Sequence, residues 1–153
     1  MEFGTIEREI YVNASPEIVF EVVSSPEHIK GWWPDEAEYE LAPGATGEIA
    51  FGDAGPDRKV ETFTVVDVQA PRTFTFRWIH PVDEVAAEGN SLLVTFDLTP
   101  SGEGTVVKMT ETGFREMGWE AAVLEESFRD HENGWNYFMP RLAPYVATLV
   151  SRP

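Results

Sequence analysis

The sequence predicts an α+β domain in which a curved antiparallel sheet of about seven strands grips one long C-terminal helix. Apolar and polar residues alternate in several segments, as in strands buried on one face. In the last segment the apolar residues recur every three or four positions instead, which is typical of an amphipathic helix. This stripe consists of Phe128, His131, Trp135, Phe138, Met139, Leu142, Tyr145, Val146 and Leu149. Layers packed in this way often enclose a ligand pocket.

The first strand is predicted over residues 4–13, where Ile6, Arg8, Ile10 and Val12 share one face. Arginine at position 8 is unusual, because the alternation calls for an apolar side chain there.

Two short helices are predicted after this strand. Ser15-Pro16-Glu17 and Ser25-Pro26-Glu27 each combine a capping serine, a first-turn proline and a first-turn carboxylate. The second helix is expected to stop near Gly31, since Trp33 precedes Pro34 and is disfavoured in helical geometry.

An antiparallel meander is predicted to follow. Its strands are expected at 37–41, 48–51, 58–68, 73–78, 92–98 and 105–112, separated by turn residues at 43–47, 52–57, 70–71 and 101–104.

The C-terminal helix contains three residues that disfavour a regular helix. Pro140 and Pro144 lie opposite the apolar stripe and are expected to bend the helix around the sheet. Gly134 suggests either a close backbone contact or a break between a short and a long helix.

Composition limits the classes of function. A single domain over residues 1–153 is expected from the length. With 27 acidic against 11 basic residues, the formal charge is −16, so nucleic-acid and anionic-membrane binding are not expected. No apolar run of about 18 residues occurs, so no membrane insertion is expected. The chain has no cysteine, which excludes disulfides and thiolate sites. We expect a cytoplasmic protein without cofactor or metal.

Ordered short motifs give the chain a family resemblance. The matching stretches are 14–20 (Ala-Ser-Pro-Glu-Ile-Val-Phe), Pro26-Glu27 leading to Trp32-Trp33, 66–72 running into 76–78, 104–107, 111–114 and Gly134-Trp135. In this order the chain resembles the START-like (SRPBCC) superfamily, and within it the activator of heat-shock-protein-90 ATPase homologue group.

The resemblance implies the helix-grip fold, with a hydrophobic cavity between the sheet and the last helix. It also implies a range of activities, because the superfamily includes lipid carriers, polyketide cyclases and hormone receptors. The eukaryotic chaperone activators of the group carry an additional N-terminal domain.

The expected function is non-catalytic binding of a small hydrophobic or amphipathic ligand, as a carrier or sensor. Burial of ~300 Å² of apolar ligand surface would contribute roughly 7 kcal/mol before the costs of binding. The candidate ligand-binding residues, any of which could instead fill the core, are Arg8, Trp32, Trp33, Phe51, Phe63, Phe76, Trp78, Phe96, Met109, Glu111, Trp135, Phe138, Met139 and Leu142.

Arg8 and Glu111 are predicted to form a pair at one end of this cavity. Glu111 shares a face with Val107 and Met109, and in the resembled fold the first and last strands are neighbours. The alternative is an arginine whose guanidinium extends to solvent at the end of the sheet.

Other chemistry has less support in the sequence. His131 is interpreted as a histidine at the edge of the core, with a role as a cavity acid or base as the alternative. His28, His80 and His131 do not have metal-ligand spacing.

Two further functions stay open. The first is a cochaperone-like interaction module with a chaperone partner, and the second is a cyclase-like or hydrolase-like enzyme of the same fold. A homo-oligomer is compatible with either.

Overall fold

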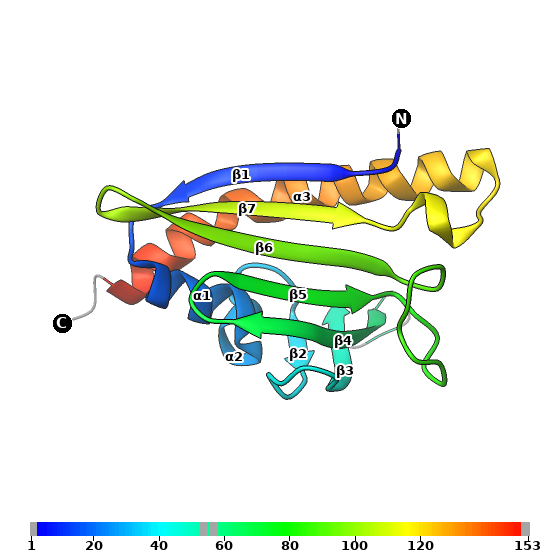
Figure 1. Cartoon of the computed structure of the whole chain (residues 1–153), viewed down its shortest axis with the longest axis horizontal. Coiled ribbons are helices and arrows are strands. Elements are labelled where there is room, and N and C mark those ends of the chain that lie inside the picture. The colour runs from blue at the N-terminus through cyan, green and yellow to red at the C-terminus, as the bar shows by residue number, and fades with distance from the viewer. Residues whose placement is uncertain (1–2, 53–54, 56–57, 151–153) are drawn as a thin grey trace.

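The computed structural model describes residues 3–52, 55 and 58–150. Seven strands and three α-helices follow one another in the predicted order, with one additional 3₁₀ turn (Figure 1). The elements are β1 (Ile6–Val12), α1 (Pro16–Ser24), α2 (Pro26–Ile29), β2 (Glu36–Glu38), β3 (Thr46–Phe51), β4 (Lys59–Gln69), β5 (Thr73–Trp78), β6 (Leu92–Ser101), β7 (Gly104–Thr112), η1 (Arg115–Met117) and α3 (Ala121–Val150).

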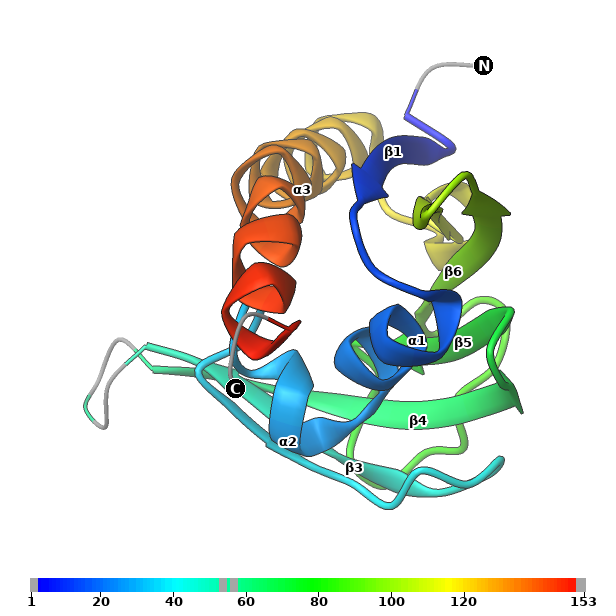
Figure 2. The ribbon, with the colours of Figure 1, turned by 90° about the vertical axis from the view of Figure 1, so that its left-hand side faces the viewer.

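All seven strands form one antiparallel sheet in the order β1-β7-β6-β5-β4-β3-β2. The first and last strands are neighbours, as the resemblance implied, and Ile6 lies directly opposite Glu111. The sheet curves, and α3 lies along its inner side (Figure 2). The predicted α+β architecture is therefore confirmed.

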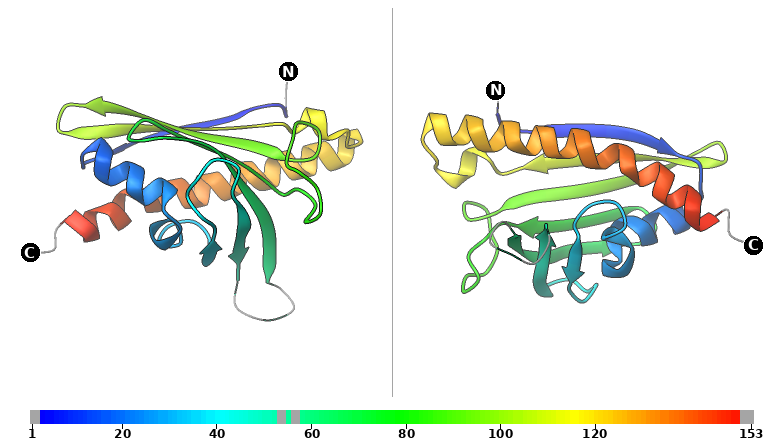
Figure 3. Two further views of the ribbon diagram at one scale, coloured as in Figure 1. Left: turned by 60° about the horizontal axis from the view of Figure 1, so that its bottom comes forward. Right: turned by 180° about the vertical axis from the view of Figure 1, so that it is seen from behind.

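Helix α3 extends along β1 and β7 and ends beside α1 and α2, as seen from behind the sheet in Figure 3. Pro140 and Pro144 are both exposed, opposite the buried stripe. The break considered at Gly134 is wrong, because α3 is continuous from Ala121 to Val150. A close contact is wrong too, since a Cβ placed on Gly134 would meet no atom within 4 Å.

The two short helices begin where the sequence predicts. Ser15 caps α1 by accepting a hydrogen bond from the amide of Ile18 at 3.4 Å, and Pro16 occupies the first turn. Ser25 precedes α2 without a side-chain capping bond, and Ile29 ends this helix close to the predicted stop at Gly31.

Strand boundaries shift by a few residues. The strand expected over 37–41 is the shorter β2, because the chain turns where the amide of Ala42 donates to the carbonyl of Glu40. Strand β3 starts two residues earlier than expected. Strand β6 continues to Ser101, directly before the turn that leads into β7. The turn predicted at 52–57 falls partly on 53–54 and 56–57, which lie outside the described residues.

One part of the layer between sheet and α3 is filled with side chains, and we call it the closed end. Phe63 stacks on Phe76 with ring centroids 4.3 Å apart, and Phe96 lies 6.3 Å from Phe76. All three are fully buried, as are Leu142 and Val146 of α3. Within the described part of the chain, no helix has the length and apolar character needed to cross a membrane.

Candidate functional site

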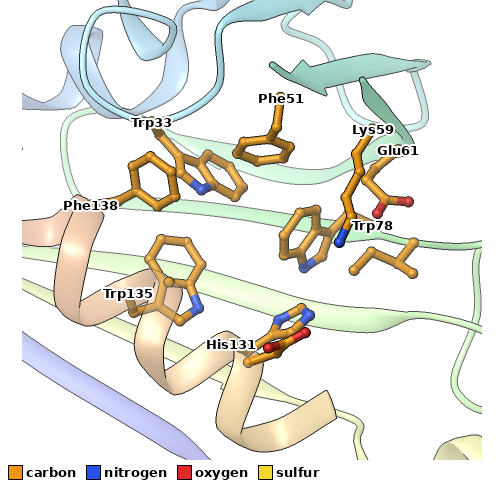
Figure 4. Close-up of a pocket in the computed structure, with 11 residues that line it drawn as sticks. Trp33, Phe51, Lys59, Glu61, Trp78, His131, Trp135 and Phe138 are labelled. Atoms are coloured by element: carbon orange, nitrogen blue, oxygen red, sulfur yellow. The ribbon is translucent and has the colours of Figure 1, made fainter. Parts of the chain in front are cut away.

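A pocket of about 300 Å³ opens at the other end of this layer, where β3 and β5 end, β4 begins and α3 passes opposite them (Figure 4). We call this region the open end. Its lining consists of Trp33, Phe51, Lys59, Glu61, Trp78, Ile79, Asp130, His131, Gly134, Trp135 and Phe138.

Five aromatic side chains from four parts of the chain form the apolar wall. Trp33, just after α2, stacks on Trp135 of α3 at 5.0 Å and meets the edge of Trp78 at 5.1 Å. Phe51 at the end of β3 lies 5.9 Å from Phe138 of α3. Because aromatic faces offer much apolar area with few rotatable bonds, this wall suits a flat apolar ligand.

A buried carboxylate fixes one side of this wall. Glu111 is completely buried and accepts three hydrogen bonds. The indole Nε1–H of Trp78 donates to Oε2 at 2.8 Å, and that of Trp135 donates to Oε1 at 2.8 Å. His131 Nδ1 lies 2.9 Å from Oε1. A buried charge with this many donors is stabilised by them, and it holds both indoles in place.

This network sets the protonation of His131. An indole N–H can only donate, so the Glu111 oxygens act as acceptors, and His131 Nδ1 is the nitrogen that donates to Oε1. Burial by itself lowers the pKa of His131, but the charge and hydrogen bond of Glu111, with smaller effects of Asp130 and Glu61, raise it above its ordinary value.

Charged groups surround the mouth of the pocket. Lys59 and Asp130 are exposed, whereas Glu61 is half-buried. Burial raises the pKa of Glu61, and this effect exceeds the opposing attraction of Lys59 and His131. In the described parts of the chain, no group of three or more acidic or histidine side chains is arranged to hold a metal ion.

Ile79 closes the end of β5 beside the pocket with an unusual backbone. Its φ of 62° lies in the left-handed region, which β-branched residues rarely adopt. The amide of Ile79 donates to the carbonyl of Thr62 at 3.0 Å, which holds the residue in place. Such conformations cost about 1–3 kcal/mol and are found preferentially near functional sites.

The structure separates the predicted ligand-binding residues that line the pocket from those that do not. Five of them line the pocket: Trp33, Phe51, Trp78, Trp135 and Phe138. Glu111 lies directly behind the wall, hydrogen-bonded to it. The remaining apolar candidates are buried in the core and do not line this pocket, namely Trp32, Phe63, Phe76, Phe96, Met109, Met139 and Leu142.

The predicted pair between Arg8 and Glu111 is wrong. Arg8 does lie on the inner face of β1, but opposite Met109, and its side chain extends to α3. Its Nε donates to Asn136 Oδ1 at 2.7 Å, and its Nη2 lies 3.8 Å from Glu132. Glu111 instead points toward the three donors described above, which leaves Arg8 outside the pocket.

Sequence reasoning missed several residues of the site. Lys59 and Glu61 share a face of β4 with Phe63, so the same alternation that placed Phe63 inside could have located them. His131 lies on the helical stripe, and the sequence favours an edge histidine there, with a cavity acid or base as the alternative. Ile79 left no signal, because its backbone conformation cannot be read from residue type.

The open end therefore combines an apolar wall with one ring nitrogen that can exchange a proton. Nε2 of His131 can donate a proton when the ring is charged and accept one when it is neutral. This chemistry would allow acid–base catalysis as well as polar recognition.

Comparison with known proteins agrees with the fold. A protein from Nitrosomonas europaea superposes with a TM-score of 0.75 at 15% identity, covering 99% of both chains. The Aha1 dimer from Colwellia psychrerythraea superposes with a TM-score of 0.67 at 19% identity, covering 93% of this chain and 95% of its own. CalU16 from Micromonospora echinospora superposes with a TM-score of 0.58 at 18% identity, covering 97% of this chain and 83% of its own. At these identities the likeness shows the fold alone.

The family was identified by a comparison of sequence. No curated protein matches the chain. The family model described as Activator of Hsp90 ATPase homolog 1-like protein matches residues 13–147. This range covers nearly the whole chain and confirms the resemblance stated from the sequence. The chain belongs to the Activator of Hsp90 ATPase homolog 1-like family.

Proposed function

We propose that the protein binds a small, flat, mainly apolar molecule at the open end, between the sheet and α3. The observation that carries the proposal is the pocket of about 300 Å³ walled by five aromatic side chains. This volume lies at the lower end of the range found for ligand sites, so a ligand with one or two rings fits better than a long lipid.

The hydrogen bonds behind the wall support the same proposal. Because Glu111 holds Trp78 and Trp135 by their indole nitrogens, these rings are fixed before any ligand arrives. A site formed in advance loses less conformational entropy on binding, which favours affinity.

Two measurements test this function. Native mass spectrometry of gently purified protein, followed by solvent extraction, would detect a co-purified molecule as a reproducible mass excess. Calorimetric titration with 1-naphthalenemethanol, a neutral two-ring probe, would then measure occupancy of the pocket directly.

A pair of α3 variants makes the titration specific. Gly134 lines the pocket and has open space beside its Cα, so Gly134→Leu should fill part of the cavity and abolish probe binding. Ala122→Leu adds a similar side chain at an exposed position of the same helix and should leave binding unchanged. Equal binding by both variants would reject the proposed site.

A chaperone partner is the second candidate, and the family match favours it. Stimulation of the ATPase of a heat-shock-protein-90 chaperone by the purified chain would support this role. Absence of both stimulation and binding would reject it. Because the similar Colwellia protein is described as a dimer, light scattering should accompany the assay and determine whether this chain self-associates.

A further inference from the structure

His131 offers a polar contact to a ligand of this pocket. Nδ1 of His131 is held by Glu111 at 2.9 Å, and across residues 3–52, 55 and 58–150 no group is hydrogen-bonded to Nε2. No buried polar side-chain atom of the described chain lacks a partner, so Nε2 is not sealed in the core. The imidazole lines the pocket, and only 17% of its side chain is exposed.

Two of the three indole nitrogens of the wall are not available to a ligand. Trp78 and Trp135 each use their single N–H to reach Glu111, so they offer only ring surfaces to an occupant. The ring of Trp78 also lies 5.3 Å from that of His131, which restrains the imidazole between an aromatic face and a carboxylate. Nε2 of His131 is therefore the nitrogen of this wall that can meet a polar group of the ligand with a full positive charge.

The charges around His131 determine what Nε2 can do. Glu111 faces it from β7, Glu61 from β4 and Asp130 from α3 itself, while Lys59 lies at the same mouth. The three carboxylates favour the charged imidazolium, in which Nε2 carries a hydrogen and donates. A negatively charged oxygen is the best acceptor for such a donor, and an ammonium group would be repelled by it.

We propose that the ligand of this pocket is an aromatic or similarly flat molecule bearing an acidic oxygen, a carboxylate or an acidic hydroxyl, which accepts a hydrogen bond from Nε2 of His131. Glu111 acts as a positioning residue, since it orients the ring through Nδ1. This inference rests on the proposed function and names the chemical class of the ligand.

Three probes with the same two-ring body test the proposal. Calorimetry at about pH 6 would compare 1-naphthoic acid, 1-naphthalenemethanol and 1-naphthylmethylamine. A charge-assisted hydrogen bond is worth enough to make the acid bind at least about tenfold more tightly than the alcohol. The amine should bind more weakly than the alcohol.

Substitution of His131 identifies the group responsible. His131→Gln should remove the preference of the pocket for the acid over the alcohol, because the glutamine amide offers no charged donor. His28→Gln is the matched control, because His28 contacts Tyr145 and Glu21 away from this pocket. Thermal unfolding of each variant would verify that it is folded.

NMR titration of the imidazole gives an independent readout. Bound 1-naphthoic acid should raise the pKa of His131, as an added negative charge beside Nε2 must. An unchanged pKa, equal affinity for all three probes, a preference for the amine, or a preference for the acid that survives in His131→Gln would each overturn the inference. Failure of every probe to bind would reject the proposed function together with it.

Discussion

The closed end and the open end are built from the same sheet and the same helix, yet only the closed end is filled. At the closed end, Phe63, Phe76 and Phe96 pack on one another as an ordinary aromatic core. At the open end, Trp78 and Trp135 are also buried, but their indole nitrogens are hydrogen-bonded to Glu111. Aromatic content alone therefore does not make a pocket; here two of the wall rings are held in place by hydrogen bonds to a buried carboxylate.

The inner face of β4 passes from one end to the other. Lys59 and Glu61 come first along this face, followed by Phe63 and Val65, which are fully buried. Burial of a charged side chain costs more free energy than burial of phenylalanine. Lys59 and Glu61 therefore stay near solvent at the start of the strand, and the mouth of the pocket stays open.

The largest expected effect is on the free energy of unfolding, when one phenylalanine from each end is shortened to alanine. Phe76→Ala should lower the free energy of unfolding by about 3–5 kcal/mol, because it leaves a cavity in a close-packed core. Phe138→Ala should cost only about 1–2 kcal/mol, since this ring is half-buried beside existing space. Urea denaturation measures both, and equal costs would contradict the distinction.

Removal of the buried charge tests the anchor. Glu111→Gln should lower the free energy of unfolding by about 2 kcal/mol, because the –NH₂ that replaces one carboxylate oxygen cannot accept the indole N–H bond made there. Glu126→Gln, an exposed position in α3, should change it by less than about 0.5 kcal/mol. Similar losses in the two variants would show that the network does not anchor the wall.

The fold could be predicted because alternation, the helical stripe and the two capped helix starts each depend on neighbouring residues. These local patterns located the strands to within a few residues. The site depends on partners far apart in the chain, such as Glu111 with Trp78 and Trp135. The alternation of side chains along β7 predicted that Glu111 faces inward, but it does not identify which donor on the inner side binds the carboxylate. The prediction of Arg8 as that partner was therefore wrong.

Residue type also could not distinguish the aromatic residues that line the pocket from those that fill the core. Trp32 and Trp33 are adjacent, yet Trp33 lines the pocket, whereas Trp32 is sealed with its indole N–H donating to the carbonyl of Val22. Which of two neighbours faces the cavity is decided by tertiary packing.

The pH dependence of stability reports on the His131 and Glu111 pair. The folded pKa of His131 is raised above its unfolded value, so the pair contributes fully below the unfolded pKa. This stabilisation is lost as pH rises through the folded pKa. The free energy of unfolding should therefore fall from about pH 6 upward, and His131→Gln should flatten that fall. A wild-type and a variant curve that stay parallel would contradict the pairing.

Gly134→Ala, at the open end, should raise the free energy of unfolding. Alanine is favoured over glycine in a helix by about 0.5–1 kcal/mol, and its Cβ meets no atom within 4 Å. The variant should unfold at higher urea concentration but bind the neutral naphthalene probe more weakly, because its methyl group narrows the pocket. Stability and affinity rising together would argue against a cavity beside this residue.

The smallest expected effect concerns Arg8. Its ion pair with Glu132 is partly exposed and 3.8 Å long, so Arg8→Gln should cost about 0.5 kcal/mol and leave probe binding unchanged. A loss as large as that of Glu111→Gln would instead indicate that Arg8 is coupled to the buried carboxylate.

The indole N–H signals of the five tryptophans test ligand binding at the open end most directly. In a ¹H–¹⁵N NMR titration with 1-naphthoic acid, the signals of Trp33, Trp78 and Trp135 should shift together and saturate. The signals of Trp32, which is buried in the core, and of Trp119, neither of which lines the pocket, should stay in place. Signals that do not move, or shifts of Trp32 and Trp119 equal to those of the other three, would contradict the account.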